Sequence, residues 1–170
     1  RKARRILDAL ERKSMIQKVP DLQEKTSYRV HDLLLDFARK KLNATGTLTD
    51  VQRLFVETLR GKFVNGEWNA TLTSNQKDYY LKYLPYHIHS SEQQSELLQL
   101  FFDLHWLEQK VKHTKIPSVV SDFRFLSTPS EEMELLKSSL MLSADVIERN
   151  PDSLCSQLLD CYRMEKSIRG

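Results

Sequence analysis

The spacing of apolar residues near the start of the chain predicts a helix and then two short strands. One helical face is formed by apolar residues three and four positions apart: Ala3, Ile6, Leu7 and Leu10. The spacing changes at Ser14, and residues 14–18 and 28–30 are each typical of a short strand. The polar residues 20–27 between them suit a turn, so the pattern predicts a small β-hairpin.

A second helix is predicted from His31-Asp32 to residue 42. Its apolar side consists of Leu34, Leu35, Ala38 and Leu42. Helix, hairpin and helix in this order form the second half of a winged-helix unit. We therefore expect residues 1–42 to be the C-terminal part of a winged-helix domain. The sequence Asn-Ala-Thr-Gly-Thr at 43–47 interrupts the helical pattern and predicts a domain boundary there.

Every apolar run after this boundary has a helical period, so residues 43–170 are predicted to be a helical arm of antiparallel helix pairs. The sequence at 49–52 resembles a capping box and predicts a helix start at Thr49. The inner side of that helix is expected to hold Val51, Leu54, Phe55, Leu59 and Phe63. Thr128 predicts another start, for a long helix to Arg149, and Asn150-Pro151 predicts the last one.

The predicted fold class is therefore mainly α, a partial winged helix with a small β-hairpin followed by an α-helical arm. Strand is expected within residues 14–30 only. Only 4 Gly and 5 Pro among 170 residues agree with this interpretation, because all-β folds need many tight turns.

Charge is distributed unevenly along the chain. Residues 1–41 carry a formal charge of +6 and residues 42–170 a charge of −3. A basic block is compatible with an anionic partner such as a nucleic acid or a phosphate, although a solvated basic face is the simpler explanation. The chain starts at Arg1 without an initiator Met or an apolar leader, so we expect a fragment or a processed chain without a signal peptide. Only two cysteines, Cys155 and Cys161, and no apolar run long enough to span a bilayer favour a cytoplasmic protein with no membrane partner.

Motifs of the common enzyme classes are missing from the sequence. It contains no GxxxxGK[ST], GxGxxG, HExxH, CxxC or GxSxG pattern, and we therefore expect no catalytic activity and no catalytic residues. We also expect no metal, because Cys155 and Cys161 have no histidine nearby, and His87 and His89 diverge on a helix. Aromatic packing between helices is favoured over base stacking for the tyrosine group Tyr79, Tyr80, Tyr83 and Tyr86.

His31-Asp32 is the candidate site that remains. It lies where the second strand leads into a helix, and a histidine there can donate a hydrogen bond to a phosphate oxygen. Asp32 can cap the first turn of the same helix. From these two residues alone, capping is the simpler explanation of the pair.

Four patterns, in order along the chain, resemble those of NB-ARC signal-transduction ATPases, the family of plant disease-resistance proteins and the apoptotic protease-activating factor. Residues 28–38, Tyr-Arg-Val-His-Asp-Leu-Leu-Leu-Asp-Phe-Ala, are similar to the Met-His-Asp motif of that family, with Val30 in place of Met. Residues 6–16 resemble the helix before the hairpin. Residues 80–88 and 96–107 are similar to the helical arm, and residues 138–143 and 150–159 to the segment before a WD-repeat propeller.

The resemblance implies a function for the site and for the arm. In the family the motif histidine contacts the β-phosphate of bound ADP, a role that falls to His31 here, with Asp32 as the motif's capping residue. The implied parent is a cytoplasmic ADP/ATP switch that oligomerises in apoptosis, and the fragment itself holds no cofactor. Its partners would be an upstream nucleotide-binding domain and downstream sensor repeats of the same chain.

Two other functions stay open from the sequence. The basic block and the hairpin are compatible with a winged-helix nucleic-acid-binding module. Against that function, residues 32–42 lack a dense face of Arg, Asn and Gln for reading bases, and nucleic acid is not the expected partner. The helices after residue 43 are also compatible with a generic protein-interaction domain.

Overall fold

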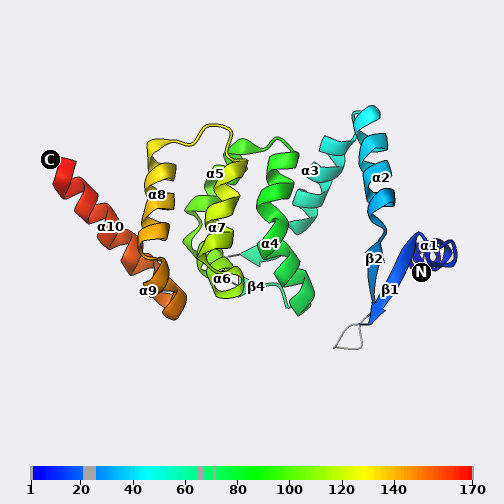
Figure 1. The fold of residues 1–170 in the computed structure, drawn as a ribbon, viewed down its shortest axis with the longest axis horizontal. Coiled ribbons are helices and arrows are strands. Elements are labelled where there is room, and N and C mark those ends of the chain that lie inside the picture. Colours follow the sequence, from blue (N-terminus) through cyan, green and yellow to red (C-terminus); the bar gives the residue numbers. More distant parts are fainter. Residues whose placement is uncertain (1, 21–25, 65–66, 71, 170) are drawn as a thin grey trace. The chain divides into compact units, whose positions relative to one another are not determined.

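A computed structural model describes residues 2–20, 26–64, 67–70 and 72–169. The chain forms two compact units, Arg1–Leu48 and Thr49–Gly170, which we call the N-terminal and the C-terminal unit. The described residues are mainly helical with a small antiparallel hairpin, so the predicted fold class is confirmed (Figure 1). The boundary expected after residue 42 falls within a helix, because that helix continues to Ala44.

The N-terminal unit has the predicted order of helix, hairpin and helix. Its elements are α1 (Lys2–Arg12), β1 (Ile16–Pro20), β2 (Thr26–Val30) and α2 (Asp32–Ala44). Ser14 has a positive φ of 56° and turns the chain from α1 into β1. The two strands pair antiparallel with Gln17 opposite Arg29 and Ile16 opposite Val30. This pairing fixes where the chain leaves β2 and enters α2.

The C-terminal unit is an array of helices in which neighbours along the chain pack on one another. The helices are α3 (Leu48–Leu59), α4 (Ser74–Ser90), α5 (Gln94–Phe102), α6 (Leu104–Thr114), α7 (Ile116–Asp122), α8 (Glu131–Leu142), α9 (Ala144–Arg149) and α10 (Leu154–Arg169). Short 3-10 turns occupy Phe123–Phe125 (η1) and Pro151–Ser153 (η2). Helix α4 contacts α7, α7 contacts α8, and α8 contacts α10, so these four helices follow one another across the unit (Figure 1).

A second pair of strands corrects the prediction that strand occurs only within residues 14–30. The strands β3 (Phe63–Val64) and β4 (Glu67–Trp68) pair antiparallel after the end of α3. Gly61, with a φ of 72°, turns the chain out of the helix in a conformation that suits glycine. The rings of Phe63 and Trp68 then lie 4.8 Å apart across the strands, and this aromatic contact outweighs the helical spacing of Phe63.

Several helix boundaries also differ from the predicted ones. Thr49 lies inside α3, which begins one residue earlier, so the capping box predicted there is wrong. A capping box does open α4, where Thr73 and Gln76 bond each other's backbone. Ser130, rather than Thr128, caps α8 by accepting a hydrogen bond from the backbone N–H of Met133 at 3.4 Å.

Two further differences concern which residues are buried and how long a helix runs. In α3, Val56 is buried, whereas Val51 and Leu54 are exposed and do not form the predicted inner side. The long helix predicted to reach Arg149 is interrupted at Ser143, which separates α8 from α9.

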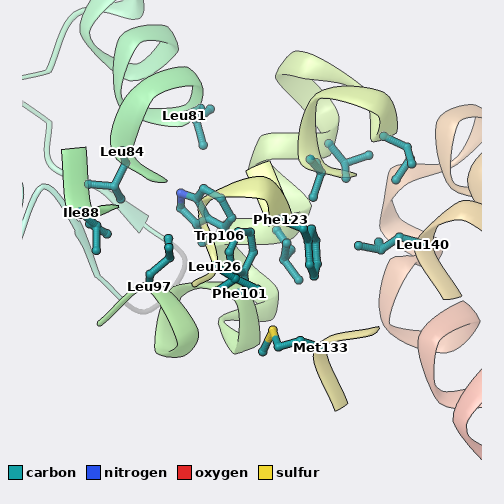
Figure 2. Packing of buried hydrophobic residues seen from close by; sticks show 14 of the residues in the cluster. Leu81, Leu84, Ile88, Leu97, Phe101, Trp106, Phe123, Leu126, Met133 and Leu140 are labelled. Atoms are coloured by element: carbon teal, nitrogen blue, oxygen red, sulfur yellow. The ribbon is translucent and has the colours of Figure 1, made fainter. Parts of the chain in front are cut away.

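One hydrophobic cluster extends from Val56 in α3 to Leu154 in α10. Trp106 and Phe101 are fully buried in its middle, with Leu81 and Leu84 to one side and Leu140 to the other (Figure 2). The rings of Phe101 and Phe123 stack at 4.5 Å. Burial of this many large apolar side chains is the main favourable contribution to folding of the unit.

A buried ion pair crosses the same core. The ammonium group of Lys110 in α6 bonds the carboxylate of Asp122 in α7 and donates to the backbone carbonyl of Leu81 in α4 at 2.8 Å. It also lies 5.1 Å from the centre of the Trp106 ring. Burial lowers the pKa of Lys110 and raises the pKa of Asp122, while the attraction between the two charges opposes both shifts. The pair ties three helices together.

Candidate functional site

The hairpin positions His31 at the start of α2. His31 follows the last residue of β2 in an extended conformation, with φ −65° and ψ 136°. Its backbone N–H donates to the carbonyl of Met15 at 3.4 Å, which continues the pairing of the two strands by one step. Its own carbonyl accepts from the backbone N–H groups of Leu34 and Leu35 at 2.9 and 3.1 Å. His31 is therefore held on both sides of its backbone.

The side chain of His31 caps α2. Its Nδ1 accepts a hydrogen bond from the backbone N–H of Leu33 at 3.3 Å. We expected Asp32 to provide this cap. Asp32 instead lies in the first turn of the helix, where its negative charge interacts favourably with the helix dipole. Capping thus explains one nitrogen of the imidazole and leaves the other available.

The cap determines which nitrogen of His31 can donate. In this arrangement Nδ1 is the nitrogen that accepts, so Nε2 is the nitrogen that can donate to another group. The side chain is exposed. His31 can therefore donate from Nε2 to an outside acceptor, such as a phosphate oxygen, without losing its contact with the helix.

A cavity of about 490 Å³ lies beside this histidine within the N-terminal unit. Its lining comes from the end of α1, the following turn, β1 and the end of β2, and consists of Glu11, Ser14, Met15, Ile16, Gln17, Lys18, Arg29 and His31. Volumes of about 300–1,000 Å³ are typical of small-molecule sites. The cavity thus has room for a group that His31 contacts.

The charged residues of the cavity are unequally paired. Glu11 and Lys18 form an ion pair of 2.9 Å, and the hydrogen bond and charge of Glu11 raise the pKa of Lys18. Arg29 has no carboxylate within ion-pair distance among the described residues. Among the described residues, Arg29 is thus the cation of the cavity lining without an acidic partner, and its charge favours an anion. Sequence reasoning selected His31 and Asp32 but missed Glu11, Lys18 and Arg29.

These residues fit the phosphate end of ADP, which the family resemblance implies as ligand. The N-terminal unit has the imidazole donor of His31, the guanidinium of Arg29 without an acidic partner among the described residues, and a cavity beside both. The sequence has no glycine-rich phosphate loop, so other groups of an ADP site would have to be supplied from outside these residues. Bound ADP would supply the negative charge that this cavity attracts.

A second histidine, His87, joins two helices and has a structural role. His87 in α4 bonds the Oε1 of Gln52 in α3 through Nδ1 at 2.6 Å and the hydroxyl of Tyr79 through Nε2 at 2.9 Å. Its ring also packs on Phe55 with a centroid distance of 4.4 Å. Burial lowers the pKa of His87. The network joins α3 to α4 and has no free nitrogen for a ligand.

The tyrosines of α4 contact aromatic neighbours. Tyr79 packs against Tyr83, and Tyr80 against Trp68, at centroid distances of 4.8 and 5.3 Å. Burial raises the pKa of Tyr80 to about 12. Within the residues described, no group of three or more His, Cys, Asp or Glu side chains is placed to hold a metal ion. Cys155 and Cys161 are both free thiols.

Comparison with known protein families gives a match over the helical part of the chain. A family model described as the APAF-1 helical domain matches residues 48–164, which is most of the C-terminal unit. No curated protein sequence matches the chain significantly. None of the helices in the described ranges is long and apolar enough to cross a membrane.

Proposed function

The chain belongs to the APAF-1 helical domain family through residues 48–164, and from this membership we propose that it is a regulatory scaffold of a nucleotide-controlled signalling protein. In this proposal the C-terminal unit is an arm between a nucleotide-binding domain before it and sensor repeats, such as a WD-repeat propeller, after it. The N-terminal unit is the last part of a winged-helix domain. The parent would be a cytoplasmic ADP/ATP-binding protein of the NB-ARC class that oligomerises in apoptosis-related signalling.

The packing of the C-terminal unit supports the role of an arm. Its cluster runs without interruption from α3 to α10, so a displacement at one end is not absorbed by a loose joint between helices. The ion pair between Lys110 and Asp122 adds a directional contact that only one arrangement of α6 and α7 satisfies. A rigid connection of this kind suits a protein in which a sensor controls a distant nucleotide site.

The observation that carries the nucleotide part of the proposal is the geometry of His31. Its Nδ1 caps α2, and its Nε2 is left to contact a phosphate oxygen beside Arg29, which has no acidic partner among the described residues. A hydrogen bond to a charged oxygen contributes about 1.5–3 kcal/mol. If the bond forms only in the closed, ADP-bound state, its loss shifts the closed-to-open ratio by about tenfold to a hundredfold.

The test is the substitution His31→Asn in the intact protein that contains the nucleotide-binding domain. Asparagine is a good N-cap, so α2 keeps its cap, but its shorter side chain does not reach the position of Nε2. We expect bound ADP to leave at least about tenfold faster and spontaneous oligomers to form, with an unchanged melting temperature. An ADP release rate equal to that of the wild type would contradict the proposal and leave His31 a capping residue.

A further inference from the structure

Arg29 and His31 are placed to act on the same ligand. They are two residues apart on extended backbone, and side chains at this spacing point to the same side of a strand. Both line the cavity of the N-terminal unit. The antiparallel partner of Arg29 is Gln17, another residue of the lining, so β1 also borders this side of the hairpin.

The two side chains supply different things to an anion. Glu11 neutralises Lys18, and Arg29 is the cation of the cavity without a described acidic partner. His31 supplies a hydrogen-bond donor at Nε2, because its Nδ1 accepts from the backbone N–H of Leu33. Asp32 follows His31 in the first turn of α2 and is not part of the cavity lining.

We infer that Arg29 and His31 together bind one phosphate group in this cavity, Arg29 through its guanidinium and His31 through its Nε2–H. This inference rests on the proposed function and adds a second residue to the phosphate contact. A guanidinium matches two phosphate oxygens at once, which a lysine ammonium does not do. The imidazole then contacts a third oxygen from the helix side. Binding therefore depends on the shape of residue 29 as well as on its charge.

The experiment is an NMR titration of the 170-residue chain with sodium pyrophosphate and, separately, with ADP, at constant ionic strength. With the rest of a nucleotide site missing, we expect a dissociation constant of about 1 mM or weaker. Both probes should shift the ring C–H signals of His31. Arg29→Gln should weaken binding about tenfold, and Arg29→Lys by a smaller factor. Arg5→Gln, which removes an exposed arginine of α1 outside the cavity, should change it less than about twofold.

The variants separate failure of this inference from failure of the proposed function. If His31→Asn abolishes the response and Arg29→Gln does not, the inference is wrong and the role of His31 stands. If Arg5→Gln weakens binding as much as Arg29→Gln, the effect is one of net charge and the inference is wrong. A response to neither probe at tens of millimolar would overturn the phosphate site as a whole.

Discussion

Lys110 and Asp122 form an ion pair inside the helical unit, from positions twelve residues apart on two different helices. The side chain of Lys110 is 0% exposed and that of Asp122 is 7% exposed. Neither charge is solvated by water to a useful extent, so each depends on the other and on the carbonyl of Leu81.

Removal of one partner of this pair should be costly. Lys110→Met leaves the carboxylate of Asp122 buried without a counter-charge, and we expect the free energy of unfolding to fall by about 3–5 kcal/mol. The double variant Lys110→Met/Asp122→Leu removes both charges and should lose less than the single one. Urea denaturation measures both.

A matched control for this prediction is Lys137→Met on α8. Lys137 has an exposed partner, Glu134, at 3.8 Å, and its replacement should change stability by less than about 0.5 kcal/mol. A double variant that is less stable than Lys110→Met alone would show that the pair contributes more than the apolar replacement can.

Stability should depend on pH through His87. Burial lowers its pKa below the ordinary value of 6.5, so the unfolded chain binds the proton more readily than the folded one. The free energy of unfolding should therefore fall as the pH decreases below about 6.5, by at most about 1.4 kcal/mol per pH unit. His87→Gln removes this titration, and the difference between the two stability curves isolates it from the other histidines. Parallel curves between pH 7 and 5 would contradict the assignment.

The cap on α2 predicts different stabilities for two variants of His31. His31→Ala removes the acceptor for the N–H of Leu33 and should destabilise the N-terminal unit by about 1 kcal/mol, whereas His31→Asn should not. Hydrogen exchange of the Leu33 amide in the two variants measures the difference. Equal protection of this amide in both would show that the imidazole contributes nothing to the cap.

Gly61 predicts a backbone effect that is separate from packing. Nothing lies within 4 Å of a Cβ built at this position, but its φ of 72° is unfavourable for other L-residues. Gly61→Ala should cost about 1–2 kcal/mol and Gly61→Asn clearly less, because asparagine tolerates this conformation. Thermal denaturation of the two variants measures this difference in stability. A neutral Gly61→Ala would show that the turn relaxes.

The hydrophobic pattern predicted the helical arm and the first hairpin, because burial of one face imposes a period on the sequence. It failed where a local contact competes with that period, as in Phe63, which pairs with Trp68 across two strands instead of extending α3. Helix starts were misplaced by one or two residues where several hydroxyl side chains compete for the cap, as Thr128 and Ser130 do.

The buried Lys110 and the cavity residue Arg29 were not predicted from the sequence, for different reasons. Lys110 lies three and four positions after Leu107 and Trp106, on the inner face, but a charged residue is normally assigned to solvent. Arg29 shares a side of the strand with His31, and this alternation was readable. That Glu11 pairs with Lys18, and not with Arg29, follows only from the three-dimensional arrangement of α1 against β1.

Packing between helices that are close along the chain has a kinetic consequence for the C-terminal unit. Contacts form between α6 and α7 and between α7 and α8, which follow each other in the sequence. The loop of chain closed by each contact is therefore short, and the conformational entropy lost in closing it is small. Chains with such local topology fold within milliseconds or faster. Folding can then start at the central helices and proceed outward to α10, which contacts α8 and η2. A partly synthesised chain could thus already hold its earlier helices in place before the last one is made.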